Sequence, residues 1–198
     1  VREETANRVL QAANAIGFHA AALIEQRLRP ALAQYRLGFI LQKPGQFFYR
    51  EFAREIGVAA SAVAGCRIVP VIDHATSQAP LDLAAKLTEM AKKVDAVAMV
   101  APDHPTLAAA VEAVRGKGVP VYSLLSDFAT GVRDGYFGVS NRKVGRTAAW
   151  IIAKTAKAPG KVALFVGSHR FQGHELREIG FRSYFREHAP EFQVLDTM

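Results

Sequence analysis

Apolar and polar positions alternate in blocks along most of the chain, and the blocks switch between the period of a strand and that of a helix. Short, nearly continuous apolar runs predict buried strands, and longer stretches with apolar residues at helical spacing predict helices. The predicted strands cover residues 37–41, 67–72, 96–101, 119–125, 136–139, 162–166 and 192–195. The predicted helices cover residues 46–64, 80–93, 105–116, 142–155 and 173–188.

This alternation predicts an α/β fold with a doubly wound parallel sheet, because each parallel strand pair needs a crossover helix that covers one face. Pro70 lies in the second strand. Since proline removes a backbone donor, that strand is expected at a sheet edge, in the order 2-1-3-4-5. Ligands of such sheets bind beyond the carboxyl ends of the strands. The rule points to the loops after Leu41, Ala101, Leu125, Val139 and Val166.

The residues before the first strand follow a different pattern. Residues 1–17 predict one short amphipathic helix that ends at Gly17, a favourable residue just past a helix. The stretch that follows is basic and rich in alanine, and Pro30 can end any helix there. A small helix joined by a basic hinge to an α/β sensor is typical of ligand-controlled DNA-binding proteins.

Composition narrows the class of protein. The chain has 198 residues, is 50% hydrophobic and carries a formal net charge of +7. The positive charge favours polyanionic partners, although it is scattered along the sequence. No apolar run approaches the ~18 residues that span a membrane. Cys66 is the only cysteine, so no internal disulfide can form, which fits a reducing cytoplasm. We therefore expect a cytoplasmic protein with no membrane partner.

Motifs for catalysis are missing from the sequence. No Gly-x-Gly-x-x-Gly follows a predicted strand, and GSHRFQG lacks the Gly-Lys-Ser/Thr ending of a phosphate loop. No Ser/His/Asp set has a nucleophile elbow. The spacing of His169, His174 and Glu175 does not match a zinc pattern. The sequence therefore predicts neither an enzyme nor a metal or other cofactor.

Four segments in the same order resemble the lactose-repressor (LacI/GalR) family of transcription regulators. VREETANRVLQAANAIGFH resembles the third helix of that family's helix-turn-helix headpiece, and RLGFILQ the first strand of its core. YFGVSNRKVGRTAAWIIA and GKVALFVGSHRFQGHELREIGFRSYF resemble two further core segments. The resemblance covers nearly all of the chain.

The resemblance implies a homodimeric, allosteric repressor that binds a double-stranded DNA operator. Its core would be of the periplasmic-binding-protein type I, with two similar subdomains around a small effector such as a sugar. The chain then divides into a headpiece end and hinge (1–35), an N-terminal effector-binding subdomain (36–158) and the start of a second one (159–198). Residues 157–161 would be the first crossover. On this interpretation the chain is truncated at both ends.

The hinge departs from the family pattern. The family usually has a Pro-Asn pair after the aromatic residue, where this chain has His19, Ala20 and Ala21. A hinge leucine commonly wedges into the minor groove and kinks a base step. Leu28 is the nearest candidate, one position out of register. We expect the DNA-contacting hinge residues to be Arg27, Leu28 and Arg29.

Two other classes of protein share this fold. An exported sugar-binding protein of a transporter is the main alternative, although it would begin with a signal peptide followed directly by the first strand. The predicted helix and basic hinge before Arg36 argue against it. A flavodoxin-like enzyme is disfavoured by the missing phosphate motifs.

The first candidate effector contacts follow the first and third strands. Aromatic rings at Phe47 and Phe48 can pack on the C–H face of a sugar, or Phe48 can belong to the helix's core stripe. Asp103 and His104 can bind sugar hydroxyls, or can cap the helix that starts at Pro105.

The other candidates follow later strands. Ser126 and Asp127 can bind hydroxyls, or form a turn before Gly131. Ser140 and Asn141 occupy the position of a polar pair in the resembled family, which often has Asp where Ser140 stands, and they can also cap the helix that starts at Arg142. The guanidinium of Arg177 can bind a vicinal diol or a carboxylate through two hydrogen bonds, or form a surface ion pair with a neighbouring glutamate.

Overall fold

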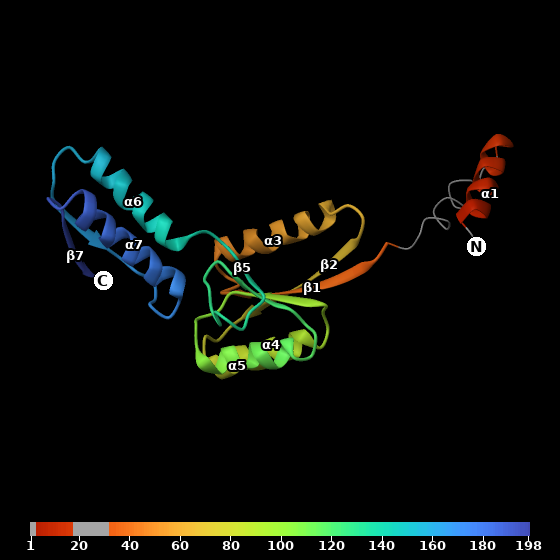
Figure 1. Cartoon of the computed structure of the whole chain (residues 1–198), viewed down its shortest axis with the longest axis horizontal. Helices are drawn as coiled ribbons and strands as arrows, with labels where there is room; N and C mark the ends of the chain where they lie inside the picture. Colours follow the sequence, from red (N-terminus) through yellow and green to blue (C-terminus); the bar gives the residue numbers. More distant parts are fainter. Residues whose placement is uncertain (1–2, 18–31) are drawn as a thin grey trace.

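A computed structural model of the protein describes residues 3–17 and 32–198. Within these ranges the chain forms two lobes, each built on a parallel sheet (Figure 1). The first lobe holds a five-stranded sheet and the second a two-stranded sheet. This architecture confirms the predicted α/β fold with a doubly wound parallel sheet.

The first sheet has the strand order β2-β1-β3-β4-β5, with all neighbouring strands parallel, as the sequence predicts. Its strands are β1 (Gln34–Gln42), β2 (Arg67–Ala75), β3 (Ala96–Met99), β4 (Val121–Leu124) and β5 (Gly135–Phe137). β2 lies at the edge and places Pro70 opposite Leu37 of β1. The edge position is confirmed, because β2 pairs with one neighbour only among the described strands.

Helices cover both faces of this sheet. Figure 1 shows α4 (Pro80–Ala91) and α5 (Pro105–Arg115) on one face and α3 (Phe47–Ala62) on the other. The main core lies under α4 and α5. It includes the fully buried side chains Leu87, Val97, Met99, Leu107 and Val111. On the opposite face a smaller cluster packs Leu41 and Val100 against α3.

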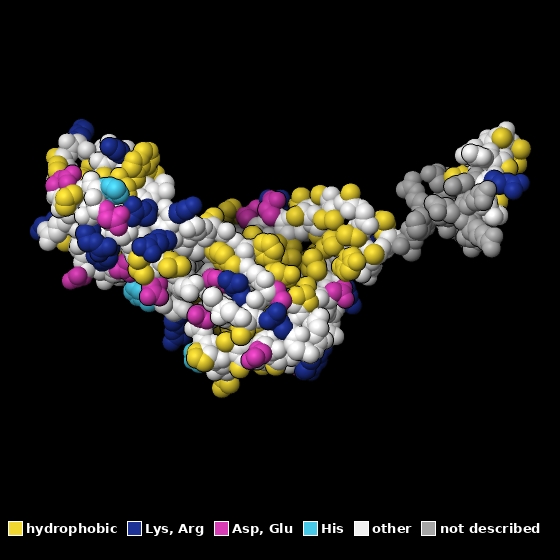
Figure 2. All heavy atoms as spheres, in the orientation of Figure 1, with side chains coloured by type: hydrophobic (Ala, Val, Ile, Leu, Met, Phe, Trp, Pro, Cys, Tyr) yellow, Lys and Arg dark blue, Asp and Glu magenta, His cyan; other side chains and the backbone are white. Residues whose placement is uncertain are grey.

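Helix α3 covers its face of the sheet only partly. None of its residues is fully buried, and Tyr49, Phe52 and Ile56 are the side chains that reach the small cluster. Phe47, Phe48 and Val58 remain exposed. Figure 2 shows the resulting apolar surface over α3.

The second lobe contains α6 (Asn141–Thr155), β6 (Lys161–Leu164), α7 (Gln172–His188) and β7 (Gln193–Thr197). Helix α6 packs along α7, and Ala149, Phe181 and Phe185 form the buried centre of this lobe. The chain therefore passes between the lobes in the short connection 138–140. Of the expected crossover 157–161, residues 157–160 lie between α6 and β6, and Lys161 begins β6, so this segment lies within the second lobe. The division into subdomains stays a proposal. In the structure α6 belongs to the same lobe as α7, because the two helices pack together.

The two helices of the second lobe approach until their backbones touch. A Cβ added to Gly145 of α6 would lie 1.9 Å from the carbonyl oxygen of Arg177, and one added to Gly180 of α7 would lie 2.1 Å from that of Arg142. Gly145 and Gly180 therefore both serve the packing of one helix on the other. Val144 of α6 is exposed, so the apolar spacing that predicts this helix does not mark its buried face. Glycine and alanine contribute little to an apolar pattern, but they allow the closest packing.

The N-terminal helix is α1 (Glu3–Ala15), followed by Gly17 in a left-handed conformation (φ 64°). This confirms the predicted helix. Its assignment to a DNA-binding headpiece stays a prediction. The predicted hinge contacts Arg27, Leu28 and Arg29 lie outside the described residues. None of the described helices combines the length and the apolar character needed to cross a membrane.

Glu178 joins the start of α7 to its surroundings. It accepts hydrogen bonds from Arg182 Nε at 2.9 Å and from the hydroxyl of Thr197 on β7. Its other oxygen lies 3.0 Å from Nε2 of His169, in the loop before α7. One carboxylate thus connects the helix, the second sheet and the loop.

Acidification is expected to destabilise the second lobe through Glu178. Hydrogen bonds from Thr197 and Arg182 lower the pKa of Glu178 from 4.5 to about 2. Because the pKa is lower in the folded state, the stabilisation is fully present above the unfolded pKa and is lost as the pH falls toward the folded one. Urea denaturation of wild type and Glu178→Gln at neutral pH and at pH ~3 measures this effect. The difference between the two proteins should shrink on acidification, and a difference that does not change with pH would contradict the prediction.

Candidate ligand-binding cleft

A cleft of about 690 Å³ lies where the two lobes meet. The first lobe contributes residues at the carboxyl ends of β1, β3 and β4, and the second lobe contributes the loop after β6 and the start of α7. This is where the strand-end rule places a ligand. The lining residues are Gln42, Lys43, Gln46, Phe48, Tyr49, Gln78, Val100, Leu125, Ser126, Gly167, Ser168, Arg170, Phe171, Gly173, His174 and Arg177.

Arg177 is held at the cleft by a neighbour on α6. Its Nε donates to Asn141 Oδ1 at 2.7 Å. Asn141 is buried, and its Nδ2 donates to the carbonyl oxygen of Leu125 and to the hydroxyl of Tyr136, both at 3.2 Å. Among the residues that the structure describes, the outer nitrogens of the Arg177 guanidinium have no hydrogen-bond partner. Asn141 is thus a positioning residue for Arg177.

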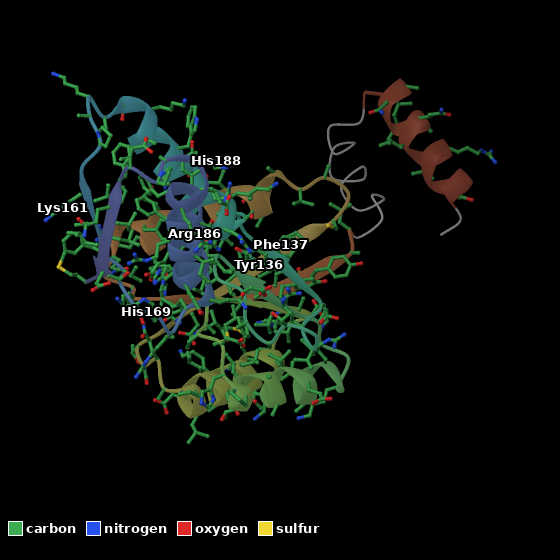
Figure 3. The ribbon with its side chains drawn as sticks, turned by 60° about the vertical axis from the view of Figure 1, so that its left-hand side comes forward. Tyr136, Phe137, Lys161, His169, Arg186 and His188 are labelled. Carbon is green, nitrogen blue, oxygen red and sulfur yellow. The ribbon has the colours of Figure 1, made fainter. Side chains whose placement is uncertain are left out.

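Tyr136 stabilises the connection between the lobes. Its hydroxyl lies 3.0 Å from the carbonyl oxygens of Leu125 and Val139. A Cβ on Gly138 would lie 2.3 Å from this hydroxyl, so the ring folds back over the connection because residue 138 is glycine. Burial raises the pKa of Tyr136 above its ordinary value, which keeps the hydroxyl protonated. Figure 3 labels Tyr136 beside Phe137 on β5.

The loop before α7 is anchored to the first lobe by two contacts. The backbone amide of Gly173 donates to Ser126 Oγ at 2.9 Å. Phe171 is only 8% exposed and packs in the cluster with Leu41, Val100 and Leu124. One polar and one apolar contact therefore fix the second lobe's share of the cleft against the first lobe.

Gln42 is a buried polar side chain in the cleft wall. It is 1% exposed, and its Nε2 donates to the carbonyl oxygen of Val100 at 2.6 Å. Its Oε1 has no hydrogen-bond partner among the described residues. A buried acceptor without a partner costs about 1–3 kcal/mol. A ligand hydroxyl that donates to this oxygen would remove that cost.

The two predicted carboxylates do not line the cleft, because residues of the first lobe bind them. Asp127 accepts two hydrogen bonds from Arg133 at 2.5 Å. Burial alone would raise the pKa of Asp127, but bonds from Arg133 and Ser123 outweigh it and lower the pKa. Asp103 accepts from the backbone amide of Ala129 at 2.9 Å.

The remaining predicted contacts divide between the cleft and other roles. Phe48 lines the cleft and stacks on Phe52 with ring centroids 6.0 Å apart. Phe47 is 70% exposed and does not line it. His104 caps α5 through Nδ1, and Ser140 occupies the N-cap position of α6. The structure thus brings Phe48, Ser126 and Arg177 together, with Asn141 behind Arg177, and ligand contact stays a prediction for every candidate.

Several lining residues were not predicted from sequence. The strand-end rule could have found Gln42, which follows the apolar run of β1, and Ser168 and Arg170, which follow the predicted strand 162–166. No sequence signal singles out Gln78 or Phe171. Among the described residues, no group of three or more His, Cys, Asp or Glu side chains could hold a metal ion.

An α/β lobe joined to a second lobe across a cleft at its strand ends is the architecture of a bilobal binding protein. The model of the family described as "Periplasmic binding protein domain" matches residues 37–198. The chain therefore belongs to this family. The match begins within β1 and leaves α1 outside it.

Solved structures of bilobal binding proteins share the fold at low sequence identity. A solute-binding protein of an ABC transporter from Agrobacterium vitis, with bound D-fucose, is 18% identical, covers 82% of this chain and 57% of its own, and has a TM-score of 0.71. The glucose-galactose binding protein GanP from Geobacillus stearothermophilus is 20% identical, with 83% and 57% covered and a TM-score of 0.70.

A third similar structure is a periplasmic solute-binding protein of an ABC transporter from Actinobacillus succinogenes 130z, with bound D-allose. It is 20% identical, with 83% of this chain and 58% of its own covered, at a TM-score of 0.70. The chain thus spans less than two thirds of the length of these proteins. No curated protein matches the sequence closely enough to count as a relative.

Proposed function

We propose that the chain is the ligand-binding part of a solute-binding protein that captures a small polyhydroxylated molecule, such as a sugar, between its lobes. In this proposal the protein binds its ligand and does not convert it. The observation that carries it is the cleft itself, which both lobes line at the carboxyl ends of their strands. Its volume of about 690 Å³ lies within the usual range for small-molecule sites.

The chemistry of the lining suits a hydroxylated ligand. Phe48 and Tyr49 offer aromatic rings against which the C–H face of a sugar can pack. Gln42, Ser126 and Arg177 offer a buried acceptor, a hydroxyl and a guanidinium to its hydroxyl groups. Structures of similar fold hold D-fucose and D-allose, which supports the proposed ligand class.

A thermal-shift panel of sugars and polyols on the intact protein tests this function. A ligand at 100 times its dissociation constant should stabilise the folded state by about 2.7 kcal/mol. Calorimetric titration then measures the affinity of any compound that shifts the transition. A panel of sugars, sugar acids and polyols that leaves the melting temperature unchanged would refute the proposed function.

Replacing Arg177 with alanine is expected to weaken ligand binding by about 1.5–3 kcal/mol, because it removes a charged donor fixed by Asn141. Arg186→Ala is the matched control. It removes an arginine from the last turn of the same helix that does not line the cleft. Titration of both variants with the best ligand of the panel measures the difference. Equal affinity of the two variants would contradict the role of Arg177.

A ligand-responsive transcription regulator of the LacI/GalR type is the second candidate function. It is favoured by helix α1, which precedes β1 outside the matched family region, and by the basic residues Arg27 and Arg29 in the sequence between them. Such a regulator would act in the cytoplasm as a homodimer on an operator. The similar transporter proteins support solute capture better, so regulation takes second place.

DNA binding separates the two candidates. A regulator should retard a mixed-sequence duplex at low salt, and the double variant Arg27→Gln/Arg29→Gln should weaken this binding, because phosphate contacts dominate non-specific affinity. Lys117→Gln/Lys154→Gln removes the same charge from α5 and α6 regions as a control. Ligand binding without any DNA binding by the full-length protein would leave solute capture as the function.

A further inference from the structure

Among the described residues, the lysine and arginine side chains of the cleft wall are not matched there by any aspartate or glutamate. Lys43 follows β1, Arg170 lies in the loop before α7, and Arg177 lies on α7 itself. These three side chains come from both lobes and line the same cleft. Opposite charges attract more strongly where water is displaced from between them.

No aspartate or glutamate lines the cleft among the residues that the structure describes. Three carboxylates close to the lining in sequence are bound by other residues, and Glu175 is exposed outside the lining. Asp127 is bound by Arg133, Asp103 by the amide of Ala129, and Glu178 by Arg182. The three cationic side chains of the wall therefore have no carboxylate beside them in the lining, and their charge is left for a ligand to balance.

Two helices begin at the cleft and add to its positive potential. Gln46 at the start of α3 and Phe171 at the start of α7 both line it. Neither helix has a side-chain cap, and α3 has no acidic residue in its first turn; α7 has Glu175 there, outside the lining. The dipole of a helix N-terminus favours an anion, and so do backbone amides that have no other acceptor. At the start of α7 the amide of Gly173 is already bound by Ser126, so α7 contributes through its dipole.

Gln42 adds an acceptor that a hydroxyl donor on a ligand could satisfy. Its Oε1 is buried in the same wall without a partner, and a carboxylate or phosphate oxygen cannot donate to it. A neutral hydroxyl group can. The cleft wall therefore favours a molecule that carries both a negative group and a hydroxyl.

We infer that the cleft takes a polyhydroxylated anion, a sugar-like molecule bearing a carboxylate or a phosphate, in preference to a neutral sugar. The inference rests on the proposed binding function and names the ligand class of that same site. The negative group lies among Lys43, Arg170 and Arg177, and a hydroxyl donates to Gln42.

The test uses matched probes on the intact protein. Calorimetric titration compares D-glucose with D-glucuronate, and D-galactose with D-galacturonate, since each pair differs only in a carboxylate. D-glucose 6-phosphate provides the phosphate arm. Of the carboxylate and the phosphate probes, the one that binds more tightly should bind about tenfold to a hundredfold more tightly than its neutral sugar. Added salt should reduce that ratio. Whichever anionic arm binds more tightly identifies the carboxylate or the phosphate.

Charge-removing variants show whether the preference arises in the cleft. Lys43→Gln, Arg170→Gln and Arg177→Gln should each lower the ratio of anion to neutral affinity. Lys117→Gln removes the same charge from an exposed site outside the lining and should keep the ratio of the wild type. Gln42→Leu, which keeps the size but removes the acceptor, should weaken neutral and anionic sugars alike.

The outcomes are distinct. A neutral hexose that binds as tightly as both its uronate and its phosphate would overturn the inference and leave the proposed binding function intact. A preference for anions that all four charge variants lower equally would also overturn it, because the protein's general charge would then be the cause. Failure of every sugar, neutral or anionic, would overturn the binding function and the inference together.

Discussion

Gly145→Ala is expected to lower the free energy of unfolding by about 3 kcal/mol, since overpacking of a close contact typically costs 1–3 kcal/mol and here the contact is backbone. The new Cβ would lie 1.9 Å from the carbonyl oxygen of Arg177 and 2.9 Å from the amide of Phe181. Neither atom can rotate away as a side chain can, so the two helices must separate. Gly180→Ala should act in the same way through Arg142.

Gly57→Ala is the matched control for this prediction. Gly57 also lies inside a helix, α3, but a Cβ there meets no atom within 4 Å. Alanine should therefore be neutral or stabilising by up to about 1 kcal/mol, its advantage in helix propensity. Urea denaturation followed by circular dichroism compares the variants. Similar midpoints for Gly145→Ala and Gly57→Ala would show that the helices of the second lobe tolerate a wider spacing.

Phe171→Ala is expected to cost about 3–4 kcal/mol of stability, the usual range for removing a buried phenylalanine. The ring fills a space between Leu41, Val100 and Leu124 of the first lobe, although its own backbone belongs to the second. Its loss leaves a cavity at the junction and frees the loop that carries Arg170. Ligand affinity should therefore fall together with stability, because the cleft must be ordered again on binding.

Phe165→Ala distinguishes a specific anchor from a general loss of apolar surface. Phe165 follows β6 a few residues earlier and is 73% exposed, so its removal should change stability by no more than about 0.5 kcal/mol. Denaturant midpoints of both variants, and titration with the best sugar, provide the comparison. An equally small effect of both substitutions would mean that Phe171 does not hold the lobes together.

The strand and helix pattern was predictable because each element depends on local spacing of apolar residues. Pro70 also predicted the edge position of β2, because a proline lacks the backbone N–H that a central strand needs for pairing on both sides. The ends of elements were less predictable. β1 begins at Gln34, where polar residues pair with β2 beyond the apolar run, so hydrogen bonding and not burial extends the strand. The tight face of α6 escaped the apolar pattern because Gly145 and Ala149 form it.

The location of the cleft was predictable from the sheet, but the side chains that line it were not. Asp127 follows β4 as Ser126 does. A turn brings Arg133 to Asp127, and the carboxylate binds this arginine and does not line the cleft. Ser126 instead faces the second lobe through Gly173. Which of two adjacent polar residues faces the cleft depends on the path of the loop. That path cannot be read from the identity of the two residues alone. Contacts between lobes, such as that of Phe171, are equally non-local.

Pro70 has a consequence for how copies of this protein meet. The outer edge of β2 is a row of backbone groups that could recruit a strand from another molecule and start a fibre-like stack. A proline in the middle of that row interrupts the donors on which such a stack depends. The same residue that fixes the position of β2 in the sheet therefore also protects the protein from aggregating edge to edge at high concentration.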